Sequence, residues 1–150
     1  MSENKPKVLV GADEEERVGR ALLLWLNTWP EKPVARIDFE DLPADGVGMS
    51  VSTIQAAFKT RQFIDGSYEA QYQFKVIYRL QPGDNESRLA ADEALNRLGA
   101  WAERNPVKPS LGENVLVRRV QRDSIASLYG TYEDGSRDHQ ILMNLLYEVR

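Results

Sequence analysis

The stretch TRQFIDGSYEAQYQFKVIYRL, residues 60–80, decides the fold of this chain. Asp65 and Gly66 signal a hairpin turn, because both central positions of a tight turn favour a positive φ, which Asp and Gly tolerate best. After the turn, apolar and polar residues alternate with a period of two, which places the apolar set on one face of a strand. That set is Tyr72, Phe74, Val76, Tyr78 and Leu80. We therefore expect the longest strand here, at the centre of a sheet.

Two amphipathic helices are expected on either side of this strand in the sequence. The first spans residues 13–28, with Asp13 as its cap and Pro30 just beyond its end, because the residue before a proline is disfavoured in the α region. The second begins at a cap, Asp84 or Asn85. Its apolar stripe, which we expect to face the sheet, includes Leu95, Leu98 and Trp101.

Alternation and turn residues predict the remaining strands. They are expected over residues 34–40, 47–54, 115–122, 125–132 and 140–149, with a strand arm or bent ribbon over 55–64. Asp134 and Gly135 mark the hairpin between the last two strands, and residues 8–10 are either a short extended segment or a hydrophobic lead-in. No internal repeat of fixed period is evident.

This order of elements predicts an α+β fold, a mainly antiparallel sheet with two amphipathic helices packed on one face. The 150 residues suit one domain, expected over 13–150 behind a loose N-terminal segment of residues 1–12. The uncovered face of the sheet should carry Ile77, Leu142 and Leu146 among polar residues. Apolar residues on such a face usually meet a partner.

Composition excludes several classes of protein. Hydrophobic residues make up 42% of the chain and charged residues 28%, an ordinary soluble balance, and the longest apolar run, residues 21–26, is far too short to span a bilayer. The net charge of -4 argues against a general nucleic-acid binder. The absence of cysteine removes disulfides, thiolate nucleophiles and thiolate metal sites, and fits a reducing cytoplasm.

No constellation of catalytic or metal-binding residues is visible. His139 is the only histidine and is expected to be an exposed loop or strand-end residue, because a catalytic triad or a zinc site needs partners that the sequence does not place beside it. The acidic cluster at Asp38, Glu40, Asp41 and Asp45 lacks the spacing of a calcium loop and is interpreted as a solvated strand end. We therefore expect no enzyme, no cofactor and no metal, although a pair of carboxylates brought together in space stays open as a catalytic device.

A cluster of arginines, Arg118, Arg119 and Arg122, is expected to pair with acids within the sheet or across a subunit boundary. Phosphate contact is the alternative, but the net negative charge disfavours it. The three tryptophans, Trp25, Trp29 and Trp101, lie on apolar helix stripes and are expected in the core.

The middle of the chain, KTRQFIDGSYEAQYQF at residues 59–74, resembles the signature region of the tailed-phage minor capsid or tail terminator proteins, in which an Asp-Gly-Ser turn is followed by an aromatic-rich strand. The stripe on the second helix and the C-terminal strand after Asp134 and Gly135 agree with this resemblance, which covers most of residues 14–150. Its motifs are structural and not catalytic.

The resemblance implies a virion protein of the phage neck. Such a protein assembles in the host cytoplasm as a ring, a homohexamer, that caps the tail tube and joins it to the head connector, with passive contact to DNA in the channel and none to membrane. The alternative is a non-viral α+β module that binds a ligand or a protein. The candidate assembly surface comprises Lys59, Arg61, Phe63, Asp65, Gly66, Tyr68, Ile77, Leu142 and Leu146.

Overall fold

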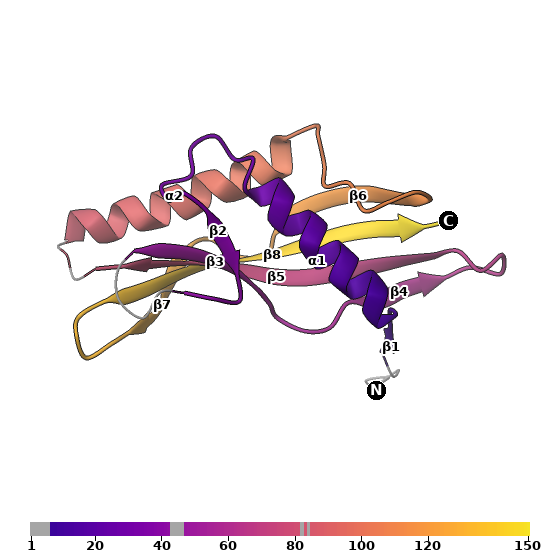
Figure 1. Ribbon diagram of the computed structural model, residues 1–150, viewed down its shortest axis with the longest axis horizontal. Helices are drawn as coiled ribbons and strands as arrows, with labels where there is room; N and C mark the ends of the chain where they lie inside the picture. Colours follow the sequence, from indigo (N-terminus) through magenta and orange to yellow (C-terminus); the bar gives the residue numbers. More distant parts are fainter. Residues whose placement is uncertain (1–6, 43–46, 82, 84) are drawn as a thin grey trace.

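The computed structural model describes residues 7–42, 47–81, 83 and 85–150. Over these residues the chain is an α+β protein with one eight-stranded, mainly antiparallel sheet and two helices (Figure 1). The elements are β1 (Val8–Leu9), α1 (Ala12–Leu26), β2 (Ile37–Phe39), β3 (Gly48–Thr53), β4 (Phe58–Gln62), β5 (Tyr68–Leu80), α2 (Asn85–Arg104), β6 (Val115–Arg122), β7 (Ser127–Thr131) and β8 (Arg137–Val149). The predicted fold class is confirmed.

Two long strands, β5 and β8, form the centre of the sheet and pair antiparallel along their whole length. Each has two short strands end to end along its outer edge: β3 and β4 along β5, and β6 and β7 along β8. β2 extends the sheet beside β3 in parallel, and β1 extends it beside β4. Residues 8–10 were predicted to be either a short extended segment or a hydrophobic lead-in. The first prediction is confirmed, because Val8 and Leu9 form β1, and Val10 is buried.

Both helices lie on the same face of the sheet, where the alternating apolar residues of the central strands form the core (Figure 1). The largest fully buried side chain is Trp29, and α1, α2, β5 and β8 contribute others: Leu22, Leu98, Tyr72, Phe74, Met143 and Tyr147. Trp25 of α1 stacks on Trp101 of α2, with ring centroids 4.7 Å apart. The prediction that the tryptophans belong to the core is confirmed for Trp25 and Trp29, while Trp101 is partly buried and packs against the core.

The strands of the second half of the chain repeat those of the first half with an offset of 69 residues. β8 occupies Arg137–Val149 and β5 occupies Tyr68–Leu80, so the two spans correspond residue for residue. The neighbouring ladders correspond as well: Phe58 pairs with Gln71 as Ser127 pairs with Gln140. The expectation of no repeat was therefore wrong. The repeat escapes the sequence because it survives as a pairing register, while most residue identities differ.

One irregularity of the sheet repeats too, although the register shift in β6 between Val117 and Arg119 has no counterpart in the described ladder of β3. β4 shifts register between Lys59 and Arg61, and β7 shifts at the equivalent place, between Leu128 and Gly130. Phe74 lies directly opposite Met143 in the ladder between the central strands. These two residues are equivalents, so an approximate two-fold axis passes between them.

The two hairpins at opposite ends of the sheet are built alike. In each, a residue in the loop, Asp65 or Asp134, accepts hydrogen bonds from the amide and hydroxyl of a serine two residues later. Only the glycine takes a positive φ, 92° at Gly66 and 85° at Gly135. The prediction of positive φ at Asp65 was wrong, because its side chain holds the turn and the glycine alone supplies the left-handed residue.

Two further boundaries differ from expectation. Gly11, and not Asp13, is the N-cap of α1, and Asp13 lies in the first turn, where its charge meets the positive end of the helix dipole. β2 is shorter than the predicted strand over 34–40, because Glu40 turns the chain away with a φ of 52°. The predicted cap of α2, Asp84 or Asn85, lies outside the residues and side chains that the structure describes.

Candidate functional site

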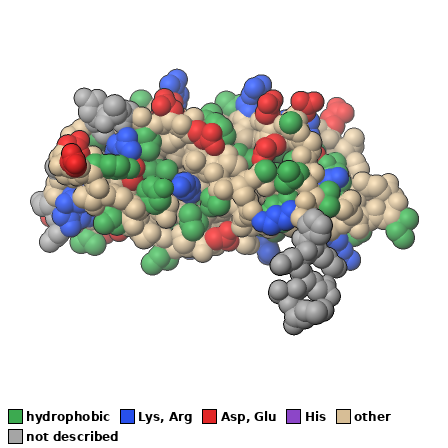
Figure 2. All heavy atoms as spheres, turned by 90° about the horizontal axis from the view of Figure 1, so that it is seen from below, with side chains coloured by type: hydrophobic (Ala, Val, Ile, Leu, Met, Phe, Trp, Pro, Cys, Tyr) green, Lys and Arg blue, Asp and Glu red, His purple; other side chains and the backbone are tan. Residues whose placement is uncertain are grey.

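The sheet face away from the helices carries three apolar residues, each opposite a polar residue in the ladder between β5 and β8. Ile77, Leu142 and Leu146 lie on this face, on alternate positions from the core residues of β5 and β8. Ile77 is 8% exposed, while both leucines are half-buried. Figure 2 shows the side of the molecule away from α2, where hydrophobic side chains occur in small groups between charged ones. This face is suited to a contact that combines apolar and polar groups.

A buried ion pair between Arg79 and Asp138 lies at one end of this face. Arg79 donates to Asp138 from Nε at 2.8 Å and from a terminal nitrogen at 2.9 Å, and the Tyr132 hydroxyl donates to the same carboxylate at 2.6 Å. Asp138 is 2% exposed, and its hydrogen bonds raise the pKa of the Arg79 guanidinium above its usual value. At the opposite end Glu69 faces Glu148 in the ladder, and Arg118 binds the latter at 2.6 Å. As expected for the arginine cluster, Arg118 pairs with an acid within the sheet.

The hairpin over residues 63–67 projects from the end of the sheet, with Asp65 and Gly66 exposed at its tip beside a fully exposed Ile64. Two cations lie over aromatic rings at its base: Lys59 Nζ is 4.3 Å from the ring centroid of Tyr68, and Arg61 is 5.0 Å from that of Phe63. The structure thus groups six of the predicted interface residues at this hairpin: Lys59, Arg61, Phe63, Asp65, Gly66 and Tyr68. The other three, Ile77, Leu142 and Leu146, lie on the open face of β5 and β8.

Tyr68 differs from the other predicted interface residues, because its hydroxyl points to α1 and binds Glu14. The same carboxylate accepts a hydrogen bond from Tyr147 at 2.8 Å. Burial and the hydrogen bond to Glu14 raise the pKa of Tyr68 to about 12. This tyrosine joins the helix to the sheet, and only its ring is in reach of the hairpin surface.

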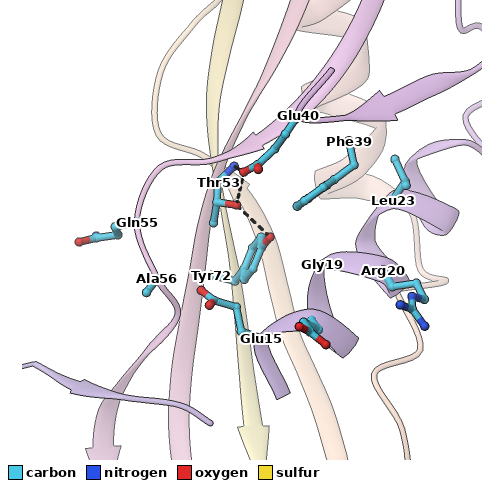
Figure 3. Close-up of a pocket in the computed structure, with 11 residues that line it drawn as sticks. Glu15, Gly19, Arg20, Leu23, Phe39, Glu40, Thr53, Gln55, Ala56 and Tyr72 are labelled. Atoms are coloured by element: carbon cyan, nitrogen blue, oxygen red, sulfur yellow. Dashed lines mark hydrogen bonds between the residues drawn. The ribbon is translucent and has the colours of Figure 1, made fainter. Parts of the chain in front are cut away.

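A hollow of about 540 Å³ opens between α1, β2 and β3. We call it the α1 hollow; its lining residues are Glu15, Glu16, Gly19, Arg20, Leu23, Phe39, Glu40, Thr53, Gln55, Ala56 and Tyr72. Figure 3 shows Glu40, Thr53 and Tyr72 in a connected row. Glu40 Oε1 accepts from the Thr53 hydroxyl at 2.9 Å, and the Thr53 and Tyr72 hydroxyls are 3.5 Å apart.

The charge of the α1 hollow is negative. Glu15, Glu16 and Glu40 face a single lining cation, Arg20. Burial raises the pKa of the Tyr72 phenol above its usual value, and the charges of Glu15 and Glu40 act in the same direction. The phenol is therefore a neutral hydrogen-bonding group at physiological pH, and the hollow offers carboxylates beside the apolar rings of Phe39 and Tyr72.

Sequence reasoning missed the α1 hollow entirely. Its residues come from segments far apart in the chain, and the acidic cluster that contains Glu40 was interpreted as a solvated strand end. The signal that existed was the turn cluster after Phe39, whose glutamate returns to the Thr53 amide at 3.4 Å. Asp38 binds Arg36 at 2.8 Å, and Asp45 lies outside the described residues.

His139 is buried, contrary to expectation, with 2% of its surface exposed. β8 begins at Arg137, three residues before the predicted start at Gln140, so His139 belongs to the strand and lies under α2. There its Nδ1 is 2.8 Å from Asp92 Oδ1, and its Nε2 is buried without a hydrogen-bond partner among the described residues.

Within the part of the chain that the structure describes, no three histidine, cysteine, aspartate or glutamate residues group as a metal site would require. None of the described helices is long and apolar enough to cross a membrane. No family model matches the chain, and no curated protein matches it.

Proposed function

We propose that this protein is a structural assembly subunit of a tailed phage, a tail terminator or neck ring that caps the tail tube and helps join it to the head connector. The proposal is supported by the resemblance of residues 59–74 and by a fold whose exposed features are those of an assembly protein. In this proposal the subunit works through surfaces, without covalent chemistry, and its location is the virion neck.

The single observation that supports the proposal is that apolar side chains are accessible on two separate surfaces of the subunit. The open face carries Leu142 and Leu146, and the hairpin at the end of the sheet presents Ile64 fully exposed. A ring needs a heterologous contact, in which two different surfaces of one subunit meet their complements on its neighbours. In the proposed homohexamer the hairpin tip of one subunit lies on the open face of the next, and the ring ends contact the tail tube and the connector.

The test combines the oligomeric state with tube binding. Light scattering and negative-stain imaging of the protein, alone and with purified tail tubes, should reveal rings or ring-capped tubes. A protein that stays monomeric and ignores both tail tubes and connector contradicts the proposal.

Leu146→Asp should reduce ring formation or tube capping at least tenfold, because it places a charge in the proposed contact. Its thermal midpoint should change little, since the leucine is only half-buried. Leu24→Asp is the matched control, because Leu24 is 67% exposed on α1, away from the open face. Equal loss of stability and assembly in Leu146→Asp would show that this face is part of the folding core instead.

A second candidate function is a non-viral module that binds a ligand or a protein. The α1 hollow favours it, because an open site with carboxylates beside aromatic rings is not required by a ring contact. Binding at the hollow by a protein that never forms rings would support this candidate over the first.

A further inference from the structure

The internal repeat shows what the α1 hollow lacks. By the offset of 69 residues, Thr53 of the hollow corresponds to Arg122 on β6, and Tyr72 corresponds to Ile141 on β8. Each of these central-strand residues lies under a helix glycine, Gly19 on α1 in the first case. The two halves therefore contain the same place in the fold with different side chains.

In the second half this place is filled by Arg122. Its stem crosses Gly99 of α2 so closely that a Cβ on the glycine would lie 2.4 Å from the arginine Cδ. Its guanidinium meets Glu103 at 2.9 Å from Nε and 2.8 Å from a terminal nitrogen, and its backbone amide donates to the other oxygen of that carboxylate at 2.9 Å. One glutamate thus holds both the strand amide and the side chain.

In the first half the glutamate is present and the arginine is not. Glu40 reaches the amide of Thr53 at 3.4 Å, as Glu103 reaches that of Arg122. The threonine side chain ends at its hydroxyl, and Thr53 lines the α1 hollow. Glu40 Oε2 and both oxygens of Glu16 have no partner among the described residues, so carboxylate oxygens remain for an incoming cation.

We propose that the α1 hollow binds an arginine side chain of a second protein molecule, placed as Arg122 is placed in the other half. The three carboxylates against one lining cation supply charge complementarity. Phe39, which is exposed at the wall beside Gly19, supplies a ring on which a planar guanidinium can stack (Figure 3). Arginine is favoured over lysine because its fork can bind a carboxylate with two parallel hydrogen bonds.

This inference goes beyond ring assembly and holds whether or not the chain forms rings. The first test is titration of the ¹⁵N-labelled protein with N-acetyl-arginine-N-methylamide, followed by amide chemical shifts at Gly19, Thr53 and Ala56. The lysine analogue should bind more weakly, and the uncharged citrulline analogue should bind about tenfold more weakly or not at all, because it keeps the shape and loses the charge-assisted bonds.

Free arginine distinguishes the source of the guanidinium. A side chain presented by a protein requires that the capped probe bind at least as well as the free amino acid. Preference for free arginine would assign the site to a small metabolite and overturn the proposal. Equal binding of all three capped probes, or shifts that map elsewhere, would overturn it as well.

Two variants complete the test. Thr53→Arg supplies the missing side chain from within and should abolish probe binding without lowering the thermal midpoint. Glu40→Gln keeps an acceptor for Thr53 and removes the charge, and should weaken the probe about tenfold. Glu31→Gln, an equal charge change on an exposed residue outside the hollow, should leave binding unchanged. Undiminished binding in Glu40→Gln would contradict the proposal even if Thr53→Arg failed to fold.

Discussion

The two halves of this sheet share one strand plan, but they differ in how they are closed. In the second half, α2 packs directly on β6, and Arg122 with Glu103 fills the space beside Gly99. In the first half, β2 and Glu40 take the corresponding edge, and the α1 hollow is left open. The difference teaches that the backbone register can be kept while side chains decide whether a given place in the fold is a packed seam or a site.

The largest effect on stability is expected from truncating the two core residues beside the approximate two-fold axis, Phe74 and Met143. Phe74→Ala should lower the free energy of unfolding by about 3–5 kcal/mol, and Met143→Ala by about 2–5 kcal/mol, because each truncates a fully buried side chain. Urea unfolding measures both. Leu24→Ala, at an exposed position of α1, should stay within about 0.5 kcal/mol of the parent. A cost under 1 kcal/mol at either axis residue would contradict a common core.

The next largest effect on stability is expected from neutralising an acidic residue at one end of the open face and should be absent for its equivalent at the other end. Asp138→Asn should cost about 2–3 kcal/mol, because it leaves the Arg79 guanidinium without its buried counter-charge. Its equivalent, Glu69→Gln, should change stability by less than about 0.5 kcal/mol, because the repulsion relieved opposite Glu148 offsets the attraction lost opposite Arg61. Similar costs for the two substitutions in urea unfolding would show that the ends are not different in this way.

A smaller effect is expected from alanine substitutions at the two helix glycines, Gly99 beside Arg122 and Gly19 beside the α1 hollow. Gly99→Ala should destabilise by about 1–2 kcal/mol, because the new Cβ displaces Arg122 from Glu103 and overpacking outweighs the gain in helix propensity. Gly19→Ala should change stability by less than about 1 kcal/mol, since its Cβ meets the Tyr72 hydroxyl at 3.0 Å and makes only an ordinary contact, at 3.7 Å, with the Phe39 ring. The reverse order of costs would contradict the contrast between the halves.

The smallest effect concerns alkaline pH and the link between α1 and the sheet. Burial and Glu14 raise the pKa of Tyr68 to about 12, above the value near 10 of an unfolded tyrosine. The unfolded state therefore loses its proton first as the pH rises. The contribution of Tyr68 to the free energy of unfolding is complete below about pH 10 and is lost as the pH rises from about 10 to 12. Unfolding free energies at pH 9, 10 and 11 should fall less steeply in Tyr68→Phe than in the parent. Tyr129→Phe, at an exposed tyrosine, should keep the parent slope.

Much of the fold was readable in the sequence, because alternation and helical spacing are local patterns. The prediction of a strand over 115–122 matches β6, and the predicted stripe of Leu95, Leu98 and Trp101 lies on α2. Local patterns failed where a partner distant in sequence decides the outcome. His139 follows a turn and was expected at the surface, but the register with β5 carries it under α2. The short extent of β2 likewise depends on Glu40 turning toward β3.

The sequence by itself determined the α+β class, the central strand from Tyr72 to Leu80 and the two Asp-Gly hairpin turns, since each rests on residues close together in the chain. Only the tertiary structure decided the internal repeat, the burial of His139 and the α1 hollow. The physical reason is that pairing register and cavity shape are set by side chains that meet across the sheet, and their volumes, such as that of threonine against arginine, have no local signature.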